Sequence, residues 1–400
     1  MTAMEKNNKT LNVPNLRFPE FSGEWEKALL NHYLEENKER NKKGVFTKND
    51  VLSVSGDYGV VNQIELLGRS FAGKSVLDYH VVRHGNIVYT KSPLKEYPYG
   101  IVKVNDGVDG IVSTLYAVYM TKENVDGKFI ENYFGLPSRT NRYFKPIVRI
   151  GAKHDMKIGN EEVLANYVIF PQLDEQKRIS EFISLLDQRI ETQKKIIEKC
   201  ESLIRGISNK LLYADNGIPI RLGDLLIERS ERTKVNNQHE VLSSTVKGIF
   251  SQREYFSKDI ASENNVGYKV IHRHDVVLSP QNLWMGNINY NDKYDIGIVS
   301  PSYKIFSIAE GYDKRFVAAL LKTHRALYNY MQVSEQGASI VRRNLNMEAF
   351  EQLTLKMPPL EIQRVIGNAI SALKSRLEIS MEMKMVYESQ KQWLLMEMFI

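Results

Sequence analysis

The chain contains an exceptionally long helical pattern that begins after Pro171 and runs to Leu212. Apolar residues recur there at alternating steps of four and three, which is the heptad spacing of a coiled coil. Acidic residues at its start and Lys210 near its end suit the helix dipole. A helix of about 40 residues is about 60 Å long, and one with only a narrow apolar seam requires a partner helix. The predicted seam consists of Ile179, Ile183, Leu186, Ile190, Gln193, Ile197, Cys200, Ile204, Ile207 and Leu211.

A second stretch supplies this partner from within the same chain. Shifted by 187 residues, the Pro-x-Leu-acid-x-Gln sequence at Pro358 overlays the one at Pro171. Ser380, Lys384 and Lys391 place polar side chains in the second seam. We therefore predict two related long helices that pair with each other. The residues expected to pair them are Ile179, Ile183, Leu186, Ile190, Ile197 and Ile204 in the first helix and Ile366, Ile370, Leu373 and Leu377 in the second.

The segments that precede the two helices also match. Gly-Ile-Val-Ser occurs at 110–113 and again at 297–300, and Val-Leu-Ser occurs at 51–53 and 241–243. Matches that keep their order over this length predict a duplicated unit, made of one mixed α/β domain and one long helix. In the first domain the strand candidates are 51–55, 81–82, 87–89, 101–104 and 111–113, and 122–142 has a helical pattern.

The expected fold class is therefore α+β, with two mixed α/β domains in tandem. Apolar anchors between prolines near the start predict an extended arm packed on the first domain. The predicted segments are an arm (1–21), a first domain (22–170), a central helix (171–213), a second domain (214–357) and a C-terminal helix (358–400).

Composition restricts the class of protein. The 400 residues are 42% hydrophobic and 26% charged, with a formal net charge of +6, which suits a globular protein with a polyanionic partner. The one cysteine, Cys200, falls in the seam and is expected to be a small buried hydrophobe. We expect neither a disulfide framework, nor a signal peptide, nor a membrane span, and therefore a cytoplasmic protein.

One motif points to a different chemistry. Residues 68–75 fit the P-loop pattern GxxxxGK[ST], whose glycine-rich turn wraps phosphate between a strand and a helix. Here 63–67 is a poor strand, and Gly85 interrupts the following segment too early for a long helix. A nucleotide-binding enzyme therefore remains an alternative, while a basic loop near DNA is the preferred interpretation.

Other catalytic patterns are weaker. His272 and His274 lie two residues apart without a supporting cluster, so we expect no metal site. Glu175 and Lys177 match half of a nuclease motif at the start of the helix, and we interpret them as a solvated helix face. The sequence has no Asn-Pro-Pro-aromatic motif of amino-methyltransferases. We therefore expect a chain that is not an enzyme.

These features together resemble a known family. The repeated Pro-x-Leu-acid-x-Gln entry into a long helix, the opening Leu-Arg-Phe-Pro at 16–19 and the ending Lys-Gln-Trp-Leu-Leu at 391–395 are similar to the specificity subunit of type I restriction–modification systems. The resemblance covers nearly the whole chain. It implies two target recognition domains, each reading one half of a split DNA sequence, and two antiparallel helices that set the distance between the halves, with pseudo-two-fold symmetry.

The same resemblance implies the partners. Two methyltransferase subunits are held by the helices and their flanks, motor–nuclease restriction subunits can join, and double-stranded DNA is the ligand. The chain itself would bind no cofactor, and S-adenosylmethionine, ATP and Mg²⁺ are expected on the partner subunits. A coiled-coil adaptor for proteins alone is a further alternative.

The candidate DNA contacts are polar and aromatic residues on loops that differ between the halves. Arg and Lys can read guanine edges, Asn and Gln can read adenine, and further cations hold phosphates. The candidates are Tyr58, Lys74, Lys91, Arg139, Arg142, Lys153 and Lys157 in the first domain and Lys247, Gln252, Arg253, Gln281, Asn282, Arg342 and Arg343 in the second.

Overall fold

The computed structural model describes residues 11–73, 75–94, 97–150, 156–210, 217–255, 264–336 and 343–400, without the side chains of residues 150, 254 and 336. The chain divides into two compact units. Unit 1 comprises residues up to Thr192 together with Met383–Ile400, and unit 2 comprises Gln193–Glu382. Each unit therefore combines one domain with parts of both long helices. The five segment boundaries predicted from the sequence stay a prediction.

Unit 1 is built around a four-stranded antiparallel sheet with the order β2-β9-β6-β7. These strands are β2 (Leu34–Glu36), β9 (Tyr116–Thr121), β6 (Ile87–Thr90) and β7 (Val102–Val104). Four antiparallel pairs surround it: β1 (Glu26–Leu29) with β12 (Tyr167–Phe170), β3 (Leu52–Ser55) with β4 (Gly59–Asn62), β5 (His80–Val82) with β8 (Gly110–Val112), and β10 (Arg149–Ile150) with β11 (Met156–Lys157). The helices are η1 (Leu30–His32), η2 (Lys48–Asp50), α1 (Gln63–Leu67), α2 (Gly127–Tyr133), α3 (Pro137–Phe144), α4 (Asn160–Val163) and the start of α5 (Leu173–Lys210).

Unit 2 repeats this topology strand for strand. Its four-stranded sheet has the order β14-β21-β18-β19, formed by β14 (Leu226–Arg229), β21 (Lys304–Ile308), β18 (Val276–Leu278) and β19 (Ile288–Tyr290). The pairs are β13 (Ile218–Arg221) with β24 (Thr354–Met357), β15 (Leu242–Thr245) with β16 (Gly248–Ser251), β17 (Lys269–His272) with β20 (Ile296–Val299), and β22 (Ser334–Gln336) with β23 (Arg343–Leu345). The helices are α6 (Leu222–Leu225), α7 (Gln252–Tyr255), η3 (Leu283–Met285), α8 (Lys314–Leu320), α9 (His324–Gln332), α10 (Met347–Gln352) and the start of α11 (Leu360–Glu397). The predicted duplication and the α+β class are confirmed.

Each unit has its own hydrophobic core. In unit 1, Trp25, Phe129 and Phe170 are buried together with α5 residues and with Leu394 and Phe399 from the end of the chain. In unit 2, Phe316 and Tyr330 are buried with Ile366 and Ile370 of α11. Because the start of each long helix contributes to the core, each helix is anchored to the domain that precedes it.

The repeated entry motif has the same structural role in both units. Gln176 is fully buried; its side-chain oxygen accepts from the backbone N–H of Asp126 at 3.0 Å, and its amide donates to the carbonyl of Pro171 at 2.9 Å. Gln363 makes the equivalent bonds to Asp313 at 3.0 Å and Pro358 at 2.8 Å. Asp126 and Asp313 in turn cap the N-termini of α2 and α8. The glutamine therefore joins the start of the long helix to a helix of the domain.

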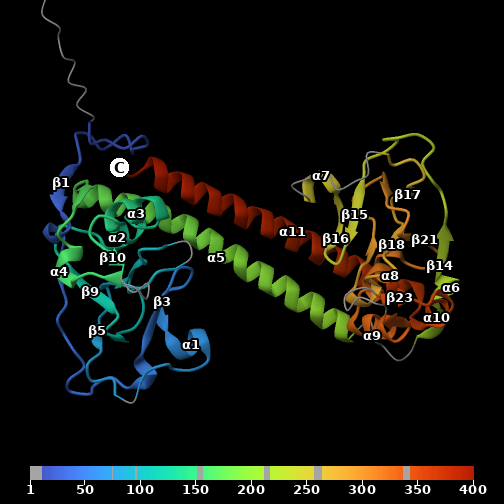
Figure 1. Ribbon diagram of the computed structural model, residues 1–400, viewed down its shortest axis with the longest axis horizontal. Coiled ribbons are helices and arrows are strands. Elements are labelled where there is room, and N and C mark those ends of the chain that lie inside the picture. Colours follow the sequence, from blue (N-terminus) through green and yellow to red (C-terminus); the bar gives the residue numbers. More distant parts are fainter. Residues whose placement is uncertain are drawn as a thin grey trace, which may run out of the picture. The chain divides into compact units, whose positions relative to one another are not determined.

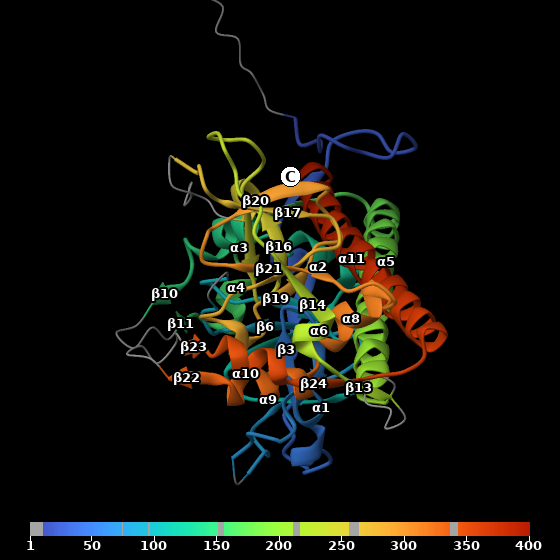
Figure 2. The same ribbon diagram turned by 90° about the vertical axis from the view of Figure 1, so that its right-hand side faces the viewer.

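The two long helices contact each other in antiparallel directions. In unit 1 the end of α11 lies beside the start of α5 (Figures 1 and 2), where Lys391 Nζ bonds Asp187 at 2.5 Å and the Arg189 guanidinium lies 5.7 Å from the Tyr387 ring centroid. In unit 2, Ile207 of α5 packs on the core that contains the start of α11. Of the predicted pairing residues, those buried are Ile179, Ile183, Leu186, Ile190, Ile366 and Ile370, and those half-buried are Ile197, Ile204, Leu373 and Leu377.

The seam is polar in its middle, as the sequence indicates. Ser380 and Gln193 are buried, and the Ser380 hydroxyl and the Gln193 side-chain oxygen have no hydrogen-bond partner among the described residues. Cys200 is a free, buried thiol, as expected. A buried polar group without a partner costs about 1–3 kcal/mol, so the middle of the seam stabilises the pair less than its ends do.

The prediction that Glu175 lies on a solvated helix face is wrong. Its side chain is only 3% exposed, and both carboxylate oxygens accept from Arg17 at 2.7 Å. Trp25 Nε1 donates to the same carboxylate at 3.3 Å. The partner lies 158 residues earlier in the chain, in the extended arm, and Phe18 of that arm packs edge-on against Phe182. The arm is thus fastened to α5 by a buried ion pair.

Candidate nucleic-acid interface

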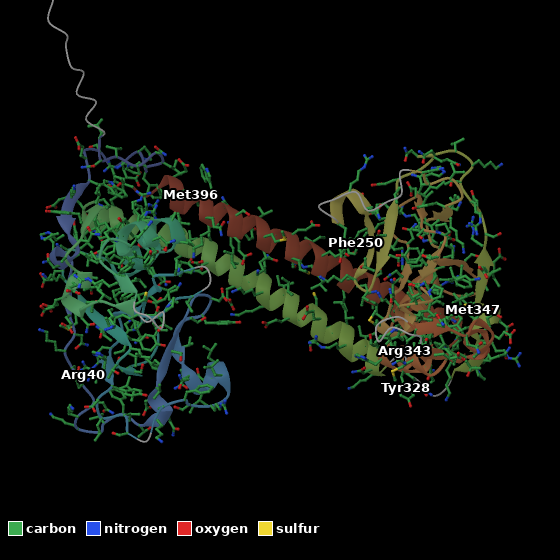
Figure 3. The ribbon with its side chains drawn as sticks, in the orientation of Figure 1. Arg40, Phe250, Tyr328, Arg343, Met347 and Met396 are labelled. Atoms are coloured by element: carbon green, nitrogen blue, oxygen red, sulfur yellow. The ribbon has the colours of Figure 1, made fainter. Side chains whose placement is uncertain are left out.

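The sharpest cluster of predicted DNA contacts lies in unit 2, where two distant segments meet. The backbone N–H of Arg343 on β23 donates to the Gln281 carbonyl at 3.1 Å. The Arg343 guanidinium lies 4.5 Å from the ring centroid of Trp284 in η3. Gln281, Asn282, Trp284 and Arg343, which we call the Arg343 cluster, therefore lie close together. Figure 3 labels Arg343 in unit 2.

The chemistry of the Arg343 cluster suits nucleic acid. An arginine stacked on tryptophan holds its planar donor fork in one orientation, which is the form that reads guanine or clamps a phosphate. The Asn282 side-chain oxygen and the Arg343 Nε are buried and have no hydrogen-bond partner among the described residues. Arg342, also predicted here, lies outside the described residues.

Sequence reasoning overlooked Trp284 as a site residue. The sequence did offer a sign of it: Trp284 lies in a loop that differs from the equivalent loop of the other half, and a large aromatic residue in such a loop is a candidate for ligand contact. Stacking on an aromatic ring is also a common way in which proteins hold bases and arginine side chains.

The other predicted contacts of unit 2 lie on the β15–β16 hairpin and α7. Lys247 is exposed in the hairpin turn, and Arg253 is exposed on α7. Gln252 is half-buried, and its amide donates to Ser243 Oγ at 3.3 Å. Gln63 donates to Ser53 Oγ at 3.0 Å in the equivalent place of unit 1. A hydrogen bond that occurs in both units points to a scaffold role for Gln252 rather than to base reading.

In unit 1, three predicted contacts are accessible. Tyr58 is 65% exposed in the turn between β3 and β4, which is the counterpart of the Lys247 turn. Arg142 on α3 and Lys157 on β11 are also exposed. Lys74 and Lys153 lie outside the described residues.

Two predicted contacts of unit 1 are engaged within the protein. Arg139 is buried, and its guanidinium donates to the carbonyls of Tyr133 at 3.0 Å and Leu395 at 2.8 Å. Burial lowers the pKa of Arg139 to about 10. The prediction of a DNA contact is therefore replaced by a structural role: Arg139 binds the end of α11 to α3. Lys91 is half-buried and donates to Asn160 Oδ1 at 2.8 Å, which leaves it poorly placed for DNA.

The P-loop pattern does not have the structure of a P-loop. A short helix, α1, precedes Gly68, and Gly68 ends that helix with a left-handed φ of 74°. Among the described residues 68–73 and 75–79 there is no helix, and strand β5 follows. This order is the reverse of strand, loop, helix, so the helix N-terminus that would face the phosphates is missing from the described residues.

The two histidines considered for a metal site bind other groups. His272 Nε2 lies 2.8 Å from Glu231, and His274 Nδ1 lies 2.5 Å from the Tyr290 hydroxyl. No helix in the described part of the chain is long and apolar enough to cross a membrane.

Comparisons with known proteins identify the fold. No family model matches the sequence. The crystal structure of the type I restriction–modification system S subunit from M. genitalium matches with a TM-score of 0.62 and 14% identity, covering 97% of this chain and 99% of that chain. A chain from a structure of the type I R-M system matches at 13% identity with a TM-score of 0.44, covering 93% of this chain and 96% of that chain. The HsdS subunit from Thermoanaerobacter tengcongensis matches at 12% identity with a TM-score of 0.39, covering 94% and 96%. The first match shows that this chain has the fold of a type I specificity subunit.

Proposed function

We propose that this chain is the sequence-specific DNA-recognition subunit of a type I restriction–modification complex. Each domain reads one half of a bipartite target, and the chain holds the methyltransferase subunits while catalysing nothing itself. The observation that carries the proposal is the duplicated fold: the same strand order occurs twice, and each copy is fastened to a long helix by the same glutamine.

Differences between the two copies support separate reading. The hairpin turn that presents exposed Tyr58 in unit 1 presents exposed Lys247 in unit 2. Trp284, on which Arg343 of β23 stacks, lies in a loop whose unit 1 counterpart, residues 89–93, contains no tryptophan. A common scaffold with different loop chemistry suits two modules that bind different base sequences.

An exposed apolar face on α11 supports contact with a partner subunit. In unit 1, Met383, Val386 and Trp393 are exposed by 37%, 61% and 49%. They are three and seven residues apart, so they lie along one side of the helix, next to the seam residue Leu394. Side chains of this size are rarely left in water along one stripe, and a methyltransferase subunit is the partner that the proposed complex supplies. S-adenosylmethionine, ATP and Mg²⁺ belong to the partner subunits in this proposal.

The proposal is tested by co-expressing the full chain with the methyltransferase subunit from the same genome and footprinting the purified complex on random-sequence DNA. We expect two protected segments separated by an unprotected gap of constant length. ATP titration of the chain alone distinguishes the nucleotide-binding alternative. A folded, assembled complex that protects no particular sequence would contradict the proposal and favour a coiled-coil adaptor.

A further inference from the structure

Unit 2 contains a cavity of about 410 Å³, and of the predicted DNA contacts Lys247 alone lines it. Its walls are the turn of the β15–β16 hairpin, helix α8 and the unit 2 parts of the long helices. Its cationic lining residues outnumber its acidic ones by three. They are Lys247, Lys293, Arg315, Lys322 and Lys374, against Asp292 and Glu378. Phe250 of this basic cavity and Arg343 lie at separate places in unit 2 (Figure 3).

The repeated fold shows what the same place contains in unit 1. Lys103 on β7 lies opposite Val88, as Asn289 on β19 lies opposite Val277. Glu131 lies five residues after the cap of α2, as Ala318 lies five residues after the cap of α8. Asn289 and Ala318 in unit 2 thus replace a lysine and a glutamate in unit 1.

In unit 1 the charges at this place are neutralised within the protein. Glu131 forms ion pairs with Lys103 and Lys128, each at 3.1 Å, and accepts from the backbone N–H of Val104 at 3.2 Å. Burial raises the pKa of Glu131, but the two lysines outweigh it and the pKa is lowered overall. The carboxylate therefore acts as a built-in anion between two cations.

In unit 2 both Glu131 and its partner Lys103 have uncharged counterparts, and the cavity contains other cations, of which Lys293 pairs with Glu378 at 3.2 Å. Lys322 Nζ donates to Asn289 Oδ1 at 2.7 Å and to the Val246 carbonyl at 3.2 Å, which are both uncharged acceptors. Burial, together with the charge of Lys374, lowers the pKa of Lys322 to about 8. Desolvation also lowers the pKa of Lys374. An ammonium has three N–H groups, so Lys322 retains one for a further acceptor.

We propose that the basic cavity binds a phosphate group. A phosphate supplies the negative charge and the acceptor oxygens that Glu131 supplies in unit 1, and several converging cations are how proteins hold it. The volume lies within the range of small-molecule sites, and Ile249, Phe250 and Ile370 provide apolar wall beside the cations. The phosphate belongs either to a free nucleotide or to the backbone of bound DNA. A free nucleotide as the source goes beyond the proposed function and is tested with the chain alone, whereas a DNA phosphate as the source rests on the proposed function.

The test titrates the purified full chain with inorganic phosphate and with AMP by calorimetry. Ala318→Glu restores the carboxylate that unit 1 has, and Lys322→Gln removes the most buried cation. Lys234→Gln, an exposed lysine of unit 2 outside the cavity, is the charge-matched control. We expect Ala318→Glu to weaken binding at least about tenfold, Lys322→Gln several-fold, and Lys234→Gln less than twofold. Circular dichroism verifies that each variant is folded.

A second arm distinguishes the two sources. In the complex with the methyltransferase subunit, affinity for a DNA duplex is measured against salt concentration. If the backbone supplies the phosphate, Ala318→Glu lowers the slope of log K against log salt by about one unit, while free phosphate and AMP do not bind. Binding of AMP or phosphate to the chain, lost in Ala318→Glu, identifies a free ligand. No effect in either arm, or an equal effect of Lys234→Gln, overturns the proposal.

Discussion

Gln176 and Gln363 make the same pair of hydrogen bonds in the two units, each from a helix start to the backbone N–H of a capping aspartate and to a proline carbonyl. Replacing either by alanine removes the partner of a partly buried N–H and of a proline carbonyl. We expect Gln176→Ala and Gln363→Ala each to reduce the free energy of unfolding by about 1–3 kcal/mol, measured by urea denaturation. Gln188→Ala, at an exposed position of α5, is the control. Equal effects of Gln176→Ala and Gln188→Ala would contradict the role assigned to the motif.

The Arg17–Glu175 pair makes a separate prediction about the N-terminal arm. Arg17→Ala leaves a carboxylate that is only 3% exposed without its bidentate partner. We expect a loss of about 3–5 kcal/mol in the free energy of unfolding. Arg205→Ala breaks an exposed ion pair with Glu201 at 3.7 Å and is expected to cost less than about 1 kcal/mol.

A double variant tests whether the loss comes from the isolated charge. Adding Glu175→Gln to Arg17→Ala removes the buried charge and is expected to restore part of the stability. A double variant that is less stable than Arg17→Ala alone would show that the loss does not come from the isolated Glu175 charge.

The buried His80 predicts a dependence of stability on pH. Burial, assisted by the charges of Arg40 and Lys91, lowers the pKa of His80 from 6.5 to about 4. The unfolded chain therefore binds the proton more readily, so the stabilising effect is complete above pH 6.5 and is lost as the pH falls towards 4. We expect His80→Gln to lose less stability than the wild type between pH 7 and 5, measured by thermal unfolding. An equal loss in both proteins would contradict the assignment.

The Arg343 cluster makes a prediction about DNA. Arg343→Ala should weaken cognate binding by the assembled complex by about 1–3 kcal/mol if the guanidinium reads a base. If it holds a phosphate, the loss should be the same on all sequences and the salt slope should fall by about one unit. Trp284→Ala keeps the charge but removes the stacked ring, so we expect a smaller loss of the same kind. Unchanged affinity of both variants would remove the cluster from the interface.

Local patterns were sufficient to predict much of the fold. The heptad spacing predicted two long helices because it depends on residues near one another in sequence. The repeated glutamine motif and the ordered matches predicted a duplicated α+β domain because a repeat is visible when the sequence is compared with itself. Strands such as β9 were not predicted, since their pairing partners lie elsewhere in the chain.

The site was less predictable because side-chain roles depend on distant partners. Arg139 has the composition of a DNA contact, but its acceptor at Leu395 lies 256 residues away. Glu175 was assigned to a solvated helix face because its partner, Arg17, lies 158 residues away and the helical pattern around Glu175 gives no sign of it. Gln281 and Arg343 were each predicted as DNA contacts from their residue types, but their contact with each other was not predicted. The basic cavity depends on Ala318, and a small apolar residue gives no sign of a binding site in the sequence.

Mapping of methylated adenines in cells that carry this chain and its methyltransferase subunit tests most directly whether each domain reads its own half-site. It should be made twice, with the natural chain and with a chain in which residues 214–357 come from a relative of different specificity. We predict a split motif with a fixed gap for the natural chain, and for the hybrid a motif in which one half is changed while the other half and the gap are kept. A hybrid that folds and assembles but changes both halves, or a natural chain that gives no split motif, would contradict the claim that each domain reads its own half-site.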